Sequence, residues 1–249
     1  MNPDDLEQRM RALEYFHDLR VLPGTWPVLR VDGRSFSRLT EARFEKPFDL
    51  RFHELMCRTT EALVTELGAV YGYTESDEIS LLLPRTSDVF DRSVEKLVSI
   101  AASIAGGTFS LGLSAVAQFD GRVWMGAQPG LVVDYFRWRQ ADATRCALNG
   151  WAYWTLRKAG RSVGEATTAL DGQTIAFKNE LLFQNGVNFN DVPAWQKRGA
   201  GLYWETFEKE GFNPKLGQAV TAVRRRIKVD RDLPMGDDYS RFIAGFVSD

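Results

Sequence analysis

The sequence predicts an α+β fold in which a mainly antiparallel sheet carries helices on one face. Over the first half, the expected order of elements is strand, helix, hairpin, helix and strand. A polar cluster at residues 74–78 lies between two apolar runs and indicates the hairpin, which requires antiparallel pairing. The second half is richer in helical pattern, so we expect additional C-terminal helices. This layering is that of ferredoxin-like domains.

The first elements lie on either side of a break that contains proline and glycine. Residues 4–20 open with two aspartates and carry apolar side chains at helical spacing, so we expect an amphipathic helix there. The apolar run 28–31 predicts a short buried strand that ends at the turn dipeptide Asp32-Gly33.

A helix and a hairpin follow. Apolar residues on one side of 49–67 predict a helix, which Gly68 is expected to end. Residues 70–73 and 79–83 predict two strands with acidic residues at the tip of their hairpin.

The next two expected elements meet at a pair of glycines. Residues 88–105 favour a helix that is closed by Gly106 and Gly107. The alternation of apolar and polar residues over 109–117 predicts a half-buried strand.

The second half begins with a long predicted helix over 130–158, and a capping box at Ser162 and Glu165 predicts the start of the next one. Beyond about residue 186 the chain is rich in Asn, Gly and Pro, and it then reaches the basic stretch 224–228. That stretch suits an RNA backbone, because clustered cations gain from counterion release, and it equally suits a solvated face. We expect one domain over residues 1–249, with a core at about 25–125 and a helical and C-terminal extension at about 126–249.

The composition limits the class of protein. The 249 residues are 44% hydrophobic and 26% charged, which is typical of a folded protein with a core. No apolar run approaches the roughly 18 to 20 residues that span a bilayer, and the start lacks the pattern of a signal peptide. We therefore expect a cytoplasmic protein without a membrane partner. The net charge of −2 requires that any RNA-binding charge be local.

The few cysteines and histidines do not indicate a metal or redox framework. Cys57 and Cys146 with His17 and His53 do not make a standard four-ligand zinc site. We expect both thiols to be buried and structural.

Acidic residues stand where two of the expected strands meet their turns. Asp32 ends one strand, and Asp77 and Glu78 stand at the tip of a hairpin that can lie beside it. Two carboxylates on adjacent strands suit a two-magnesium site, because magnesium prefers hard oxygen ligands and leaves positions open for phosphate oxygens and water. A single acid in a turn is more often structural, so this spacing does not decide the function by itself.

Five sequence strings give a more specific indication. They are VLRVDGRSF at 28–36, YGYTESDEIS at 71–80, FDGRV at 119–123, WRQAD at 138–142 and KNELLF at 178–183. Together they resemble the family of tRNA-His guanylyltransferase and its bacterial and archaeal relatives, the 3′-to-5′ RNA polymerases. The resemblance covers about residues 25–205.

The resemblance implies a polymerase-palm domain, similar to that of DNA polymerases and nucleotidyl cyclases, with added helices and a homotetrameric assembly. It implies that Asp32, the backbone carbonyl of Gly33 and Asp77 ligate two Mg²⁺ ions, and that Glu78 supports this catalytic site. The implied chemistry activates a 5′-monophosphorylated RNA with ATP or GTP. The 3′-hydroxyl of an incoming nucleotide then attacks the activated phosphate, so tRNA and nucleoside triphosphates are the expected partners.

Both steps displace a phosphate leaving group, so both need groups that hold phosphates, for which arginine is well suited. The residues that the resemblance assigns to nucleotide and triphosphate binding are Arg30, Gly33, Arg34, Ser35, Phe36, Lys46, Ser76, Arg92, Lys96, Arg122 and Lys178.

Three departures from the family pattern bear on the substrate. Ser37 stands where the eukaryotic enzymes have a histidine, and ATRCA at 143–147 replaces their Cys-His-Ile-Asn-Asn run. These differences favour the bacterial branch, which repairs 5′-truncated tRNAs by templated addition, over G addition to tRNA-His. FDRS at 90–93 has one basic residue where an arginine pair is common, which removes one expected triphosphate contact.

Two other classes of function are open at this point. A nucleotidyl cyclase shares the palm and its paired acids, although the strings at 138–142 and 178–183 belong to the tRNA-directed family. A catalytically inactive RNA-binding protein is the other alternative. It has no reason to keep three carboxylates whose mutual repulsion costs stability without a metal.

Overall fold

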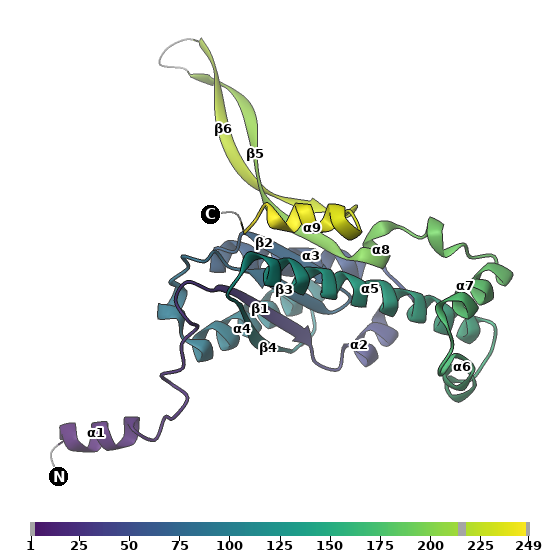
Figure 1. Ribbon diagram of the computed structural model, residues 1–249, viewed down its shortest axis with the longest axis horizontal. Helices are drawn as coiled ribbons and strands as arrows, with labels where there is room; N and C mark the ends of the chain where they lie inside the picture. Colours follow the sequence, from purple (N-terminus) through teal and green to yellow (C-terminus); the bar gives the residue numbers. More distant parts are fainter. Residues whose placement is uncertain (1–2, 214–217, 248–249) are drawn as a thin grey trace.

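The computed structural model describes residues 3–213 and 218–247, and a six-stranded antiparallel sheet lies at its centre (Figure 1). The strand order across the sheet is β4-β1-β3-β2-β5-β6. The strands are β1 (Trp26–Gly33), β2 (Tyr71–Glu75), β3 (Glu78–Leu82), β4 (Phe119–Gly126), β5 (Ala200–Asn213) and β6 (Gln218–Asp230). The α+β class and the 70–83 hairpin are thus confirmed.

Helices cover both faces of this sheet. The helices are α1 (Pro3–Arg11), α2 (Phe36–Arg43), α3 (Leu50–Leu67), α4 (Val94–Leu113), α5 (Pro129–Lys158), α6 (Val163–Leu170), α7 (Ile175–Gln184), α8 (Ala194–Arg198) and α9 (Gly236–Ala244), with short 3₁₀ turns at Val89–Arg92 and Phe189–Asp191. Helices α3 and α4 pack on one face, and the C-terminal helices α5 and α9 pack on the other (Figure 1).

The alternation of side chains along β1 explains the two layers. Leu29 and Val31 point into the core beneath α3 and α4, whereas Val28 points into the core beneath α5 and α9. Arg30 and Asp32 share the face of Val28 because side chains alternate with a period of two. The polar end of β1 therefore lies on the α5 side of the sheet.

Several local predictions are confirmed. Gly68 ends α3 in the left-handed conformation, with φ of 64°. The capping box is present, with Ser162 Oγ accepting from the Glu165 N–H and the Glu165 carboxylate accepting from the Ser162 N–H. Helix α5 spans the range expected for the long helix.

The predicted helix over 4–20 is wrong in extent, since α1 ends at Arg11. No residue of α1 is buried, and Leu13 and Phe16 beyond it are exposed. An amphipathic pattern gives little helix stability unless its apolar face packs against something. Within the described residues, this segment stands apart from the sheet (Figure 1).

The predicted strand over 109–117 is also wrong, because α4 continues to Leu113 and the strand is β4. Leu97, Ala101, Ala105 and Phe109 recur every four residues and form the buried stripe of one continuous helix. A Cβ at Gly107 would meet no atom within 4 Å, so this glycine does not mark a break. In the described part of the chain, α4 alone has the length and apolar composition of a membrane-crossing helix.

Strands from the second half of the chain complete the sheet. Strand β5 pairs with β2 through residues 200–203, and β5 and β6 then continue together as a long hairpin that projects from the body (Figure 1). The sequence did not predict these two strands. The basic stretch 224–228 lies on β6.

Candidate active site

Asp32 and Asp77 are brought together where β1 ends and the β2–β3 hairpin turns. Asp32 pairs with Glu78 across the β1–β3 ladder. The N–H of Gly33 donates to the carbonyl of Asp77 at 3.1 Å, which ties the end of β1 to the turn. The side chain of Asp77 itself receives a hydrogen bond from Ser76 Oγ at 3.1 Å.

A row of acids crosses four strands at this end of the sheet. Asp120 of β4 pairs with Asp32, Asp32 pairs with Glu78, and Glu78 pairs with Glu75 of β2. Side chains directly opposite one another in antiparallel strands lie on the same face, and like charges there repel. Asp120 and Glu75 belong to sequence strings that indicated the family, but no pattern in those strings assigned them a role.

Burial and repulsion raise the pKa values of the acid pair. Burial raises the pKa of Asp77 to about 6, and the nearby carboxylate of Asp32 adds to this rise. Burial also raises the pKa of Asp32, with a further contribution from Asp120, while Arg122 and Arg30 oppose it. The pair therefore holds unfavourable negative charge that a cation would relieve.

The oxygen atoms at this position suit a divalent cation that prefers oxygen ligands. Within the described residues, Asp77 is partly buried and forms no ion pair within 4.0 Å, and Ser76 Oγ donates to its carboxylate. Asp32 and the Gly33 backbone add further oxygen donors beside it. No three His, Cys, Asp or Glu side chains of the described chain gather as a ready-made metal cage. Magnesium takes one or two carboxylates and fills its other positions with water and phosphate oxygens, so two aspartates and a backbone carbonyl suit it.

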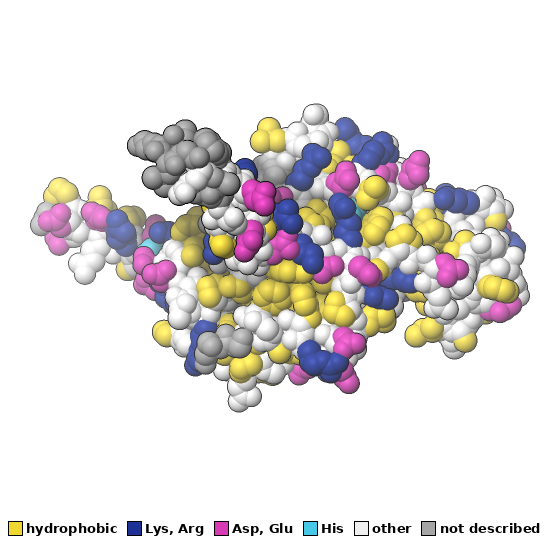
Figure 2. Space-filling model, turned by 90° about the horizontal axis from the view of Figure 1, so that it is seen from above, with side chains coloured by type: hydrophobic (Ala, Val, Ile, Leu, Met, Phe, Trp, Pro, Cys, Tyr) yellow, Lys and Arg dark blue, Asp and Glu magenta, His cyan; other side chains and the backbone are white. Residues whose placement is uncertain are grey.

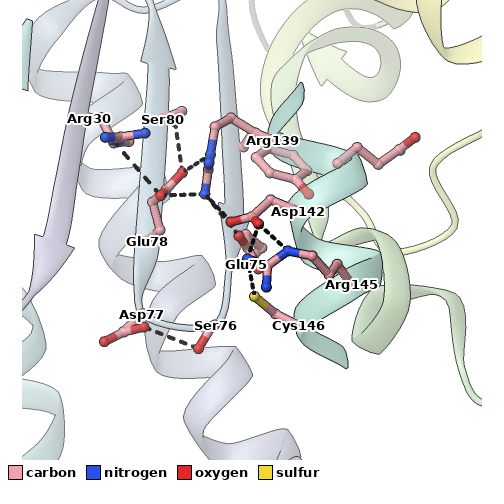
Figure 3. A network of polar contacts seen from close by, with 12 residues as sticks. Arg30, Glu75, Ser76, Asp77, Glu78, Ser80, Arg139, Asp142, Arg145 and Cys146 are labelled. Atoms are coloured by element: carbon pink, nitrogen blue, oxygen red, sulfur yellow. Dashed lines mark hydrogen bonds and ion pairs between the residues drawn. The ribbon is translucent and has the colours of Figure 1, made fainter. Parts of the chain in front are cut away.

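Glu78 lies apart from Asp77 and enters a buried network with Arg139 of α5 (Figure 3). Arg139 donates from Nε and Nη2 to the two oxygens of Glu78, each at 2.7 Å, and its Nη2 also donates to Glu75 at 3.3 Å. Burial raises the pKa of Glu78 and Arg139 opposes that rise, while burial and Glu78 raise the pKa of Glu75 to about 8. Sequence reasoning assigned no role to Arg139. Its place in the WRQAD string at 138–142 was the available signal.

The Gly-Arg-Ser-Phe string builds the corner behind Asp32. A Cβ at Gly33 would lie 2.5 Å from two ring atoms of Phe36, so the ring packs directly on the glycine. Ser35 takes a left-handed conformation, with φ of 61°, as the N-cap residue of α2. The N–H of Arg34 donates to the carbonyl of Gln118 at 2.8 Å, and its side chain is exposed. Gly33, Ser35 and Phe36 thus shape the backbone of this corner, and their contacts with a nucleotide stay predictions.

Two adjoining pockets lie beside the β2–β3 turn, and they hold about 860 Å³ and 700 Å³ when the open solvent at their mouths is included. Lys46, Ser76 and Trp154 line both of them. The smaller also takes in Asp77 and Ser37, and the larger is walled by α5 and by Trp195. The larger pocket is also lined by Cys146, which is exposed, so the expectation that both thiols are buried holds for Cys57 alone.

Lys46 and Arg122 lie near the acid pair. Asp77 and Glu41 raise the pKa of the Lys46 ammonium, but burial outweighs both and lowers it. Arg122 pairs with Arg30 across the β1–β4 ladder and donates to Asp120 at 3.0 Å. Arg30 itself lies 3.9 Å from Glu78, measured from Nε to Oε2, and is largely buried.

Arg92 and Lys178 are not brought to the acid pair within the chain. The guanidinium of Arg92 donates to backbone carbonyls near the start of β1, at the opposite end of that strand from Asp32. Within the chain, Arg92 therefore holds the segment before β1 and does not reach the acid pair, and its phosphate contact stays a prediction. Lys178 of α7 donates to Asn149 at 2.8 Å and lines neither pocket. Lys96 is exposed in the first turn of α4.

The basic stretch on β6 lies on the projecting hairpin, away from the acid pair. Arg226 pairs with Glu205 at 2.6 Å, and Arg225 lies over the ring of Trp204 at 4.4 Å. On the face seen in Figure 2, Lys and Arg side chains are interspersed with Asp and Glu. Within the described residues, the cations that act on the acid pair are Lys46, Arg122, Arg30 and Arg139, and the basic stretch of β6 is not among them.

Paired acids at the end of an antiparallel palm-type sheet, beside a pocket with cationic and aromatic walls, are shared by nucleotidyltransferases and nucleotidyl cyclases, and similarity to known proteins identifies this chain as a nucleotidyltransferase. The family model described as tRNAHis guanylyltransferase matches residues 7–127, and that of the Thg1 C terminal domain matches 130–232. The probable tRNA(His) guanylyltransferase of Mus musculus is 32% identical over 213 residues, which cover 79% of this chain and 72% of the relative. The chain therefore belongs to the tRNA-His guanylyltransferase family.

Other relatives agree. The tRNA(His) guanylyltransferase of Schizosaccharomyces pombe is 32% identical over 203 residues, which cover 77% of this chain and 78% of the relative. The chain spans 42% of the length of tRNA(His) guanylyltransferase 2 of Arabidopsis thaliana, at 30% identity over 90% of this chain.

Solved structures show the same fold. A bacterial tRNA(HIS) guanylyltransferase (Thg1)-like protein in complex with GTP has a TM-score of 0.74 and 26% identity, covering 97% of this chain and 98% of that one. The complex of such a protein with ATP has a TM-score of 0.75 and 26% identity, covering 97% and 99%.

Proposed function

We propose that this protein adds nucleotides to the 5′ end of tRNA in the 3′-to-5′ direction, after activation of a 5′-monophosphate by ATP or GTP. The observation that carries the proposal is the Asp32–Asp77 pair, which opens onto the pocket lined by Lys46 and Trp154. Family membership and the relatives bound to GTP and ATP support it.

The residues around the acid pair take different roles in binding metal ions, phosphates and the nucleobase. Asp32, Asp77 and the Gly33 carbonyl would hold two Mg²⁺ ions, which when bound neutralise phosphate charge and favour the attacking hydroxyl. Lys46 offers an ammonium to the phosphates of the nucleotide in the pocket. Trp154 and Trp195 offer flat walls on which a nucleobase can stack. Arg122 is exposed on the other side of Asp32 and offers a guanidinium to a second phosphate group.

Repair of truncated tRNA is favoured over single G addition to tRNA-His. The two sequence departures fall on the pocket walls, because Ser37 lines the smaller pocket and Ala143, Cys146 and Ala147 line the larger. Without the imidazole and amide groups of the eukaryotic enzymes, these walls offer fewer groups to select one identity nucleotide. Base pairing with the opposite strand would then select the nucleotide.

The test uses purified protein, Mg²⁺, all four nucleoside triphosphates and two end-labelled tRNAs. One is full-length tRNA-His, and the other lacks its first nucleotide. Extension of the truncated tRNA to its natural length supports templated repair, and addition of one G to tRNA-His alone would contradict it. Extension of neither, even with 5′-triphosphorylated ends, would contradict the proposed function.

The matched variants of this assay change charge without changing size. Asp32→Asn and Asp77→Asn should each abolish extension while the circular dichroism spectrum stays that of the wild type. Asp134→Asn removes an exposed acid of α5 and serves as the control. Full turnover in either active-site variant would contradict the assignment of the acid pair.

We extend the proposal to the assembly, in which the whole chain forms one catalytic unit and four copies form a homotetramer. The pairing of β5 with β2 supports the single unit, because the second half of the chain supplies strands to the sheet of the first. Light scattering coupled to size-exclusion chromatography gives the mass, and a monomer that retains full activity would contradict the tetramer.

A further inference from the structure

One buried side chain holds both ends of the turn that carries Asp77. Glu75 ends β2 and Glu78 begins β3, and Ser76 and Asp77 are the two residues between them. The guanidinium of Arg139 donates to both oxygens of Glu78 and to Oε1 of Glu75. It therefore bridges the two strands at the base of the turn (Figure 3).

The conformation of the turn is strained at one residue. Ser76 has φ of 48°, in the left-handed region that costs energy for a residue other than glycine. Such conformations persist when the surrounding structure determines them from several sides.

Repulsion between the acidic side chains of the turn also opposes its closed conformation. Glu75, Asp77 and Glu78 fall within four consecutive residues, and Asp32 is paired directly with Glu78. Like charges that face each other across a ladder repel. Arg139 is 6% exposed, so solvent screens its attraction for the two glutamates only weakly.

We propose that Arg139 is a positioning residue, which fixes Asp77 by tying Glu75 to Glu78 and so holds the Asp32–Asp77 pair at the spacing that a divalent cation needs. This inference rests on the proposed role of the acid pair. Arg139 acts through the turn, since its described hydrogen bonds go to the flanking glutamates and to Asp142. Partners that orient metal ligands in this way commonly change metal affinity or activity by about 10- to 100-fold when they are lost.

The bridge also connects the turn to the nucleotide pocket. Asp142 accepts from Arg139 Nη2 at 3.1 Å and from Arg145 Nε at 3.0 Å. The following residues of α5, Ala143 and Cys146, line the larger pocket together with Glu75. Glu75 thus belongs both to the bridge and to the pocket wall, whereas Ala143 and Cys146 do not bond to Arg139.

The experiment compares Arg139→Lys and Arg139→Gln with the matched control Arg145→Gln. Lysine keeps the charge but lacks the planar fork that bridges two carboxylates. Arg145 lies on the same helix and bonds to the same Asp142, but its side chain is exposed. Binding of Mn²⁺ alone to the full chain is titrated by electron paramagnetic resonance, without nucleotide or RNA.

We expect the dissociation constant for Mn²⁺ to rise about tenfold or more in both Arg139 variants and less than about twofold in the control. The turnover number on truncated tRNA should fall in parallel, while the Michaelis constant for ATP stays within about twofold, because the pocket walls remain. Circular dichroism checks the fold. If the glutamine variant does not fold, the lysine variant, which avoids an uncompensated acidic cluster, decides the question.

A folded Arg139 variant that binds Mn²⁺ as tightly as the wild type overturns the inference. A wild-type protein that binds no Mn²⁺ overturns both the inference and the proposed acid pair. Inactivity of the wild type on every tRNA would contradict the proposed function alone, because the cation titration needs no RNA.

Discussion

Replacing Gly33 with alanine forces a methyl group against the ring of Phe36. The added Cβ would lie 2.5 Å from two ring atoms, where an ordinary contact needs more than 3.4 Å. The ring is 2% exposed and is held by Phe109 and Phe119, whose ring centroids lie 5.1 Å and 4.9 Å away. Because the ring has no room to move, we expect the overpacking to cost about 1–3 kcal/mol of unfolding free energy.

The same substitution should reduce catalysis more than stability. Gly33 follows Asp32, and its N–H donates to the carbonyl of Asp77 at 3.1 Å. A shift of this backbone changes the distance between the two carboxylates. A misplacement of about 1 Å in a catalytic geometry costs on the order of 100-fold in rate. We expect a loss of turnover of that order in the folded Gly33→Ala protein.

Urea unfolding followed by circular dichroism gives the free energy of unfolding. Denaturing gels that resolve the length of the end-labelled truncated tRNA over time give the rate of nucleotide addition. Gly107→Ala is the matched control, because its Cβ would meet no atom within 4 Å inside α4. That change should stabilise the protein by up to about 1 kcal/mol. Phe36→Leu should recover part of the loss in the double variant, because it removes the colliding ring. A Gly33→Ala protein within about 0.5 kcal/mol of the wild type, or with unchanged turnover, would refute the reasoning.

Three further predictions follow from other contacts. Burial lowers the pKa of His53 to about 4, so the stability that its neutral form contributes is complete above about pH 6.5 and is lost as the pH falls toward 4. Urea unfolding across pH 4 to 7 gives the free energy of unfolding of the wild type and of His53→Phe. The difference between these two free energies should change by up to about 3 kcal/mol over this range, and a constant difference would contradict the prediction. Arg92→Ala should lower the free energy of unfolding by about 2–4 kcal/mol with turnover retained, because the guanidinium donates to the carbonyls of Val21, Leu22 and Ser87. A variant that loses turnover at unchanged stability would show instead that Arg92 binds the nucleotide. Lys46→Met should raise the Michaelis constant for ATP about tenfold, equivalent to about 1.4 kcal/mol, and an unchanged constant in steady-state kinetics would remove Lys46 from the phosphate site.

The acid pair could be predicted from the sequence because its geometry is mostly local. A hairpin with a two-residue turn fixes where Asp77 lies, and a short apolar strand fixes where Asp32 ends. The convergence then needs one further fact, the pairing of β1 with β3. The family strings supplied that fact, whereas spacing alone did not.

Arg139 could not be assigned in the same way. It meets Glu78 across 61 positions of sequence, and no periodic pattern encodes which face of α5 turns toward the acids. Strands β5 and β6 escaped prediction for a different reason. Their outer parts are exposed on both faces, so the apolar alternation that indicates a strand is absent. The apolar residues of 109–117 fit the period of a strand as well as that of a helix. The helix forms because Phe109 and Ala105 lie in the same buried cluster.

The hairpin of β5 and β6 gives the molecule a gradient of local stability. Beyond Tyr203, β5 has lost its pairing with β2, and β6 is its remaining neighbour in the described sheet. A two-stranded ribbon without a third strand or a core is marginal in water. Its amide hydrogens should therefore exchange progressively faster outward from Tyr203, on a timescale separate from that of the sheet. The end of β2 beside the acid pair should not fray in this way, because Ala200 and Gly201 of β5 are paired with Thr74 and Tyr73 of β2.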